Sequence, residues 1–374
     1  MSSKWSQITM ASLVLGLLSY TTAPTQAQST PRRTLLALSK KAHTLSIVDP
    51  VTLKVLAQLP VGPDPHEVIA TADGKRAYVS NMGMGEMGMG ESYHEVDVLD
   101  LVSQKSLPNI DIAPLSAPHG LDFQDGKVWL TVQGSKAIAR IDPATAKVDW
   151  IMGTGQDWTH MIYVTPDARH IYASNAHSGT ISLFEKALSK QFFFKGKGPG
   201  GPGPHGPFSN GPNPNDHQGP PQPQKQWEQT LVKVSPGSEG FDVSPDGRQL
   251  WTASGMNGNV AIIDLASKKV VATLKGKVDG ANRVKFTPDG HWVFVSSLST
   301  GDLVVFDAVA RKEIKRISLG HGAAGIQMDG PDNRVFIGCS MDDYVAVVDL
   351  TSLELIGKVD VGGMPDGLAI AVRP

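Results

Sequence analysis

Short runs of β-branched, aliphatic and aromatic residues recur along this chain, and each follows a turn-forming pair. Examples are residues 77–81 (Ala-Tyr-Val-Ser-Asn), 171–175 (Ile-Tyr-Ala-Ser-Asn) and 293–296 (Val-Phe-Val-Ser), each preceded by Asp-Gly or a related pair. Runs of this length and composition, bounded by turn residues, are typical of β-strands. The pattern therefore predicts an all-β protein built from many short strands.

The turns and strands repeat at a fixed spacing. An acidic residue ends the third strand of each unit, and Asp264, Asp307 and Asp349 follow one another at intervals of 43 and 42 residues. A period of about 40–45 residues with several strands per unit indicates a β-propeller blade. Six complete units lie between residues 66 and 360, and two longer intervals mark insertions.

The two ends of the chain supply the parts of a seventh unit. Residues 34–61 have the pattern of a second, third and fourth strand, and residues 368–372 have the pattern of a first strand. Joined in one sheet, they close the ring and leave no open edge there. We predict one seven-bladed β-propeller over residues 28–374, with four antiparallel strands per blade.

The repeat motifs resemble those of the YVTN-repeat, or YncE-like, family of periplasmic propellers. Residues 77–81 and 171–175 carry this resemblance, together with the Ser/Thr-Pro-Asp-Gly turns at 244–247 and 287–290. The resemblance covers nearly all of the mature chain and implies WD40-like blades in a periplasmic protein. It implies no particular activity, because propellers host many unrelated functions.

The N-terminus has the features of a secretory signal peptide. Lys4 precedes an apolar stretch at residues 8–18, and Thr25-Gln26-Ala27 places small residues at the usual cleavage positions. We expect residues 1–27 to be removed and the protein to be periplasmic. An uncleaved membrane anchor is the alternative, but the stretch is short for a bilayer span, so we expect no stable membrane anchor.

Charge and cysteine content narrow the function. The formal net charge is −2, which disfavours nucleic acid as a partner. Cys339 is the single cysteine, so the chain has no internal disulfide and no Cys-x-x-Cys-His site for covalent haem. The sequence also lacks a Gly-x-Ser-x-Gly elbow and a His-Glu-x-x-His motif. These absences favour a binding protein over an enzyme.

We call the face of the propeller that carries the loops between second and third strands the top, and the opposite face the bottom. Aligning the units on their turn aspartate places one residue of each unit at the top mouth of the axial channel, just before the innermost strand. We call this set the mouth ring: His66, His119, His160, Glu239, Asn282, Ala324 and Asp366. His119 joins it only if its unit is one residue shorter. Imidazoles and a carboxylate converging from several segments suit zinc, copper or iron. The alternative is a water-filled polar mouth.

Two neighbours of the mouth ring are further candidates for ligand contact. Arg283 follows Asn282 and is suited to hold a substrate carboxylate, and Trp158 lies two residues before His160. For Trp158 the alternative is packing between adjacent blades.

The first insertion, residues 82–93, is rich in Met and Gly and falls in a top loop. Met82, Met84, Met87 and Met89 lie close together, with His94 just beyond. Thioethers are soft ligands that favour Cu(I), so the segment is a candidate copper site. A flexible loop that meets a partner is the alternative.

The second insertion, residues 192–226, is rich in Gly and Pro and falls between the third and fourth strands of its blade, on the bottom outer edge. Its composition cannot form a packed core, so we expect it to be disordered and to take no part in top-face activity.

Three functions remain open. The first is a binding protein that presents a small molecule, a metal ion or a partner protein with a site at the top face. The second is a lactonase-type hydrolase that uses the polar ring. The third is a copper-handling propeller or a redox partner. Copper or another divalent metal is therefore the candidate cofactor.

Overall fold

The structure is a computed structural model that describes residues 31–83, 93–188 and 225–374. The predicted signal peptide, Met84, Met87 and Met89, and all but the last two residues of the 192–226 insertion lie outside the described residues. Among the described residues, no helix has the length and apolarity needed to traverse a bilayer.

The described residues form strands almost exclusively, joined by short turns. In chain order the strands are β1 (Arg33–Ser39), β2 (Thr44–Val48), β3 (Val55–Pro60), β4 (Pro65–Ala70), β5 (Arg76–Asn81), β6 (Glu95–Asp100), β7 (Lys105–Asp111), β8 (Pro118–Gln124), β9 (Lys127–Val132), β10 (Ala137–Asp142), β11 (Lys147–Gly153), β12 (Thr159–Val164), β13 (His170–Asn175), β14 (Thr180–Leu188), β15 (Lys225–Lys233), β16 (Ser238–Val243), β17 (Gln249–Ser254), β18 (Val260–Asp264), β19 (Lys269–Leu274), β20 (Ala281–Phe286), β21 (Trp292–Ser297), β22 (Asp302–Asp307), β23 (Lys312–Ser318), β24 (Ala323–Asp329), β25 (Arg334–Cys339), β26 (Tyr344–Asp349), β27 (Glu354–Asp360) and β28 (Pro365–Val372). Two short 3₁₀ turns, η1 (Gln133–Ser135) and η2 (Gly330–Asp332), complete the elements.

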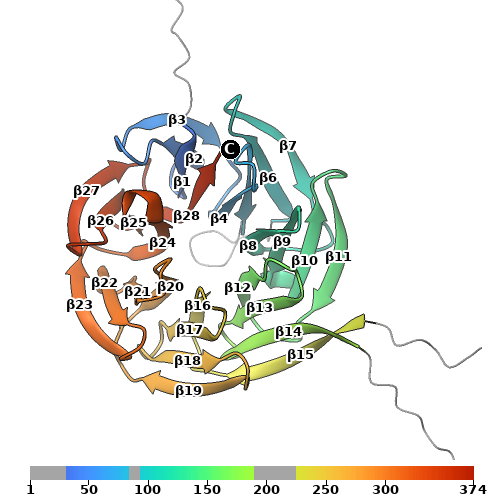
Figure 1. Ribbon diagram of the computed structural model, residues 1–374. Helices are drawn as coiled ribbons and strands as arrows, with labels where there is room; N and C mark the ends of the chain where they lie inside the picture. Colours follow the sequence, from blue (N-terminus) through green and yellow to red (C-terminus); the bar gives the residue numbers. More distant parts are fainter. Residues whose placement is uncertain (1–30, 84–92, 189–224) are drawn as a thin grey trace, which may run out of the picture. The chain divides into compact units, whose positions relative to one another are not determined.

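The strands build seven antiparallel four-stranded sheets arranged around an axis, which confirms the predicted seven-bladed propeller (Figure 1). The innermost strands are β28, β4, β8, β12, β16, β20 and β24, and each contacts the next around the ring. One sheet has the order β28-β1-β2-β3, so the C-terminal strand pairs with the N-terminal strands as predicted. Backbone bonding continues to the ends, where Arg373 N–H donates to Arg32 O at 2.8 Å.

Aromatic residues on the second strand of six of the seven blades fill the space between blades, and β1 of the closing blade has leucines there instead. Trp129, Trp251 and Phe336 are almost completely buried. Trp251 of β17, for example, packs with Val284 and Phe306 of the following blade. Large aromatic side chains remove the most apolar surface from water per residue, so these contacts hold adjacent blades together.

The two insertions leave the sheets where the repeat pattern placed them. The Met-rich segment connects β5 to β6, a link between second and third strands, and the Gly/Pro-rich segment connects β14 to β15, the third and fourth strands of one blade. β14 and β15 remain paired out to Leu188 and Lys225, the last described residues before and after the second gap.

Candidate functional site

A repeated backbone device aims one side chain per blade into the channel. Two positions before each mouth-ring residue the backbone has a positive φ; these residues are Asp64, Ala117, Trp158, Gly237, Gly280, Gly322 and Met364. The pairing between first and second strands then slips at the ring residue in every blade. Such a β-bulge leaves extra residues unpaired and re-aims a side chain. The ring residues thus lie inside the innermost strands, at the bulge, rather than before them as the sequence alignment suggested.

Hydroxyl groups fix the backbone of this ring. The hydroxyls of Ser80, Thr131 and Ser174 each donate to the carbonyl of the ring residue in the next blade, namely His119, His160 and Glu239, at 2.5 Å in each case. Thr131 Oγ1 also accepts from the bulged N–H of Gly120 in its own blade at 2.8 Å. The Thr131 hydroxyl thus provides a hydrogen-bond acceptor for an N–H group in the β-bulge and a hydrogen bond to the next blade.

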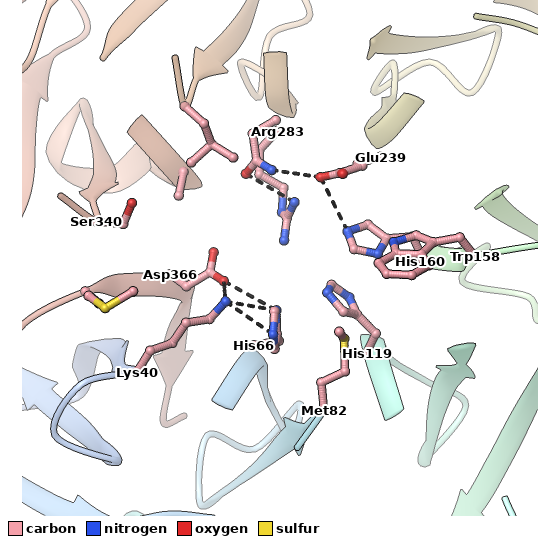
Figure 2. Close-up of a pocket in the computed structure, with 14 residues that line it drawn as sticks. Lys40, His66, Met82, His119, Trp158, His160, Glu239, Arg283, Ser340 and Asp366 are labelled. Carbon is pink, nitrogen blue, oxygen red and sulfur yellow. Dashed lines mark hydrogen bonds and ion pairs between the residues drawn. The ribbon is translucent and has the colours of Figure 1, made fainter. Parts of the chain in front are cut away.

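All seven mouth-ring residues line one cavity of about 250 Å³ at the channel mouth (Figure 2). The sequence-predicted Arg283 and Trp158 line it too, and so does Met82. The structure therefore brings together most of the predicted site, including His119, whose place required a shorter repeat.

The three ring histidines contact one another. The ring centroids of His66 and His119 are 4.7 Å apart, and those of His119 and His160 are 3.7 Å apart with a 33° angle between planes. Imidazoles that share one tetrahedral metal ion have centroids about 5 Å apart, since each metal–nitrogen bond is about 2.0–2.1 Å. His119 and His160 are closer than this, with their rings tilted against each other. In the described part of the chain, no group of three or more His, Cys, Asp or Glu residues is arranged to hold a metal ion.

His119 has an unusual environment. It is fully buried, and neither Nδ1 nor Nε2 has a hydrogen-bond partner among the described residues. Burial lowers the pKa of His119 well below its ordinary value, and the neighbouring His160, His66 and Arg283 lower it further. The imidazole is therefore neutral at pH 7, with one donor and one acceptor unused.

His160 is also neutral but is held in place. Its Nδ1 lies 3.1 Å from Oε1 of Gln133. Because an amide oxygen only accepts, Nδ1 carries the proton and Nε2 keeps its lone pair. Nε2 lies 3.8 Å from a carboxylate oxygen of Glu239. Burial lowers the pKa of His160 well below its ordinary value and raises that of Glu239.

One wall of the cavity carries a tight charge cluster. Lys40 Nζ lies 2.8 Å from Asp366 Oδ2 and 3.1 Å from His66 Nδ1, and His66 Nε2 lies 3.2 Å from Asp64 Oδ1. Burial opposes ionisation of Asp366, but Lys40, Arg283 and His66 outweigh burial and lower its pKa. Asp366 is therefore an anion already neutralised by Lys40.

Arg283 reaches across the channel. Its Nη2 donates to Glu67 Oε1 at 2.5 Å and its Nη1 donates to Asn282 Oδ1 at 3.2 Å, while Asn282 Nδ2 donates to Glu239 at 3.0 Å. Figure 2 shows the guanidinium directed into the space between His66, His119 and Glu239. Arg283 also lines a second cavity of about 170 Å³ deeper in the channel, with Glu67 and Met161.

Asp122 lies in this deeper cavity. Its Oδ2 accepts from the backbone N–H of Val164 in the next blade at 2.6 Å. Burial raises the pKa of Asp122 to about 6, despite its backbone hydrogen bonds.

Trp158 lies at the predicted cavity, and its ring contact is within its own blade rather than between adjacent blades. It lines the mouth cavity, and its ring lies 4.2 Å from that of His177, which follows the second strand of the same blade. Its φ of +59° is uncommon for a bulky residue, and the backbone bond from Ala176 N–H to Trp158 O at 3.0 Å helps to fix it.

The sequence alignment missed a second circle of residues, those that directly follow each second strand. Lys40, Leu298 and Ser340 are cavity-lining members of this circle, and Met364 is a further cavity residue that was missed. Met82 also belongs to this circle but was predicted only as a copper ligand. Gln133 occupies the equivalent position after β9 and holds His160. Extending the alignment to the end of each second strand would have found Lys40.

The described residues of the candidate copper site, Met82 and His94, do not lie in the same cavity. Met82 is buried and lines the mouth cavity, whereas His94 is half exposed, lies 3.0 Å from Asp111, and is not among the residues that line the cavity. Met84, Met87 and Met89 lie outside the described residues.

Residues 215–326 match the family "Cytochrome D1 heme domain", which is less than half of the chain. No curated protein shows a match.

Solved structures share the propeller fold at low sequence identity. A protein of unknown function from Desulfotomaculum acetoxidans has a TM-score of 0.65 at 14% identity, with 91% of this chain and 99% of that chain covered. A candidate 6-phosphogluconolactonase from Bacteroides uniformis has a TM-score of 0.66 at 12% identity, with 91% and 100% covered. Dihydro-heme d1 dehydrogenase NirN in complex with DHE has a TM-score of 0.57 at 14% identity, with 88% and 64% covered. At these identities the likeness shows the fold alone.

Proposed function

We propose that this propeller is a binding protein that holds a small polar ligand in the cavity at its channel mouth. One observation carries the proposal: His119 is fully buried on the cavity wall with both ring nitrogens unpartnered among the described residues. A buried polar group without a partner costs about 1–3 kcal/mol. A ligand that hydrogen-bonds to His119 would recover that free energy on binding.

The cavity limits the size of this ligand. Its volume of about 250 Å³ lies below the roughly 300–1,000 Å³ of pockets for drug-sized molecules. A tetrapyrrole exceeds that size, so the cavity does not fit an enclosed haem d1, and we derive no function from one. A compound with few heavy atoms, or an ion, matches the space.

The charges next to the histidines weigh against a metal ion in this cavity. Arg283 and Lys40 lie near the imidazoles and repel cations, and the ring centroids of His119 and His160 are only 3.7 Å apart, closer than those of two imidazoles on one metal ion. We therefore place a polar organic ligand ahead of zinc or copper, and we keep both metals as probes in the test.

The test is binding by isothermal titration and thermal shift with a defined panel: acetate, gluconate, glucono-δ-lactone, acetamide, Zn²⁺ and Cu(I). We expect at least one probe to bind the wild type and to bind His119→Leu at least tenfold more weakly. A panel that stabilises both proteins equally, or neither, would overturn the proposal. A variant at an exposed residue of another blade, Met256→Leu, is the matched control, since Met256 is 74% exposed.

A lactonase is the second candidate, and the pair formed by His160 and Glu239 favours it. A neutral imidazole with a free Nε2 beside a half-buried carboxylate could act as a general base towards a water molecule. Release of acid from glucono-δ-lactone, followed with a pH indicator, tests this candidate. A rate that is unchanged in His160→Gln would exclude it.

We also propose that the protein acts in the periplasm, because residues 1–27 have the features of a signal peptide. Fractionation of cells that express the full chain tests this. Retention of an unprocessed chain in the cytoplasm would contradict it.

A further inference from the structure

We infer that the ligand of the mouth cavity carries a carboxylate, which Arg283 and His119 receive together. This inference rests on the proposed function and adds the chemical class of the ligand.

The guanidinium of Arg283 supplies the first half of the carboxylate site. It has five N–H donors, and its side-chain acceptors among the described residues are Glu67 and Asn282. Figure 2 shows the guanidinium pointing into the cavity rather than along its wall. Arginine N–H groups bind carboxylates in a planar, charge-assisted geometry.

The imidazole of His119 supplies the second half. As a neutral ring it donates one hydrogen bond, and that donor has no partner among the described residues. The strongest charge effects on this ring come from His160, His66, Arg283 and Lys40, and each of them lowers its pKa. Of these groups Arg283 and Lys40 carry a positive charge, and a carboxylate held by Arg283 could also accept the hydrogen bond that His119 has to offer.

The carboxylates of the protein leave the space in front of His119 available. Asp366 is paired with Lys40, and Glu67 is paired with Arg283. Glu239 is the acid whose charge faces the ligand without a cation within ion-pair distance, apart from the neutral His160 at 3.8 Å. Its charge opposes a carboxylate ligand, so removing that charge should strengthen binding.

The experiment compares acetate and gluconate with acetamide, which matches acetate in size but lacks the charge, and with sulfate. Affinities are measured by isothermal titration at pH 7. We expect both carboxylates to bind at least tenfold more tightly than acetamide, and sulfate to bind more weakly than gluconate. Sulfate binding as tight as that of the carboxylates would show that the site accepts oxyanions in general, and this would overturn the inference.

The variants have opposite expected signs. Arg283→Met together with Glu67→Gln removes the guanidinium without leaving a buried unpaired charge, and should weaken carboxylate binding about 10- to 100-fold. Glu239→Gln keeps the size and the acceptor for Asn282, and should tighten it. Arg316→Met, on the outer strand β23, is the control that should change nothing. Unchanged affinity in the double variant would overturn the inference.

The outcomes separate the two proposals. If acetamide, lactone or a metal binds the wild type and loses affinity in His119→Leu while carboxylates do not bind, the cavity is a binding site and only the carboxylate is wrong. If no probe distinguishes wild type from His119→Leu, both proposals fail.

Discussion

Replacing His119 by leucine should stabilise the ligand-free protein while it removes ligand binding. His119 is fully buried and both of its ring nitrogens lack partners among the described residues. Leaving a buried polar group unsatisfied costs about 1–3 kcal/mol. Leucine has no polar atom to satisfy, so the substitution removes this cost. It also loses the tilted ring contact with His160, and such aromatic pairs contribute about 0.5–1.5 kcal/mol.

His160→Leu is the matched control for this prediction. It removes a buried imidazole from the same 3.7 Å ring contact, so the loss of that contact nearly cancels between the two variants. His160, however, has a partner, since its Nδ1 lies 3.1 Å from Gln133 Oε1. Its removal leaves that oxygen unpaired and should destabilise the protein by about 1–3 kcal/mol. The difference between the variants should therefore be about 2–6 kcal/mol in favour of His119→Leu.

The assay is urea unfolding of dialysed, ligand-free protein, followed by tryptophan fluorescence with a common m-value for all three proteins. Equal destabilisation by the two substitutions would refute the reasoning, because it would show that the nitrogens of His119 are satisfied in solution.

Three further predictions concern the ring and the channel. Deleting residues 364–374 removes β28 and its hydrogen bonds with β1, so the free energy of unfolding should fall by more than about 5 kcal/mol, whereas a circular permutant that joins residue 374 to residue 31 should stay folded. Thermal melts followed by circular dichroism check both proteins, and a stable truncated protein would contradict the role of β28 in closing the ring. Arg283→Met alone should lower the free energy of unfolding by about 3–5 kcal/mol because it leaves Glu67 as a buried unpaired charge, and adding Glu67→Gln should recover part of that loss. Urea unfolding measures both variants, and losses that simply add would show that Arg283 and Glu67 do not stabilise each other. Folding raises the pKa of Asp122 to about 6, so the folded protein binds this proton more tightly than the unfolded chain, and the free energy of unfolding should fall by at most about 3 kcal/mol as the pH rises from about 4 to 6. Asp122→Asn should lack this pH-dependent decrease, and identical pH profiles for the two proteins would contradict the prediction.

The repeat in the sequence determined the architecture of this protein and the face that carries the site. A turn, an aromatic second strand and a period of 42 or 43 residues fix where each position lies within a blade, and therefore place His66, His119 and His160 at one end of the axis. Ring closure followed from the same pattern, because the missing first strand of one end was present at the other.

Only the tertiary structure decided which side chains meet in the cavity. Arg283 and Glu67 are 216 residues apart, and Lys40 and Asp366 belong to opposite ends of the chain, yet each pair forms an ion pair. The repeat predicts how far along the propeller axis and how far from it a residue lies, but not which residue it contacts across the channel. That contact depends on the β-bulge that directs each side chain and on the rotamers of the side chains around it. The unpartnered state of His119 is a property of this packing and has no signal in the sequence.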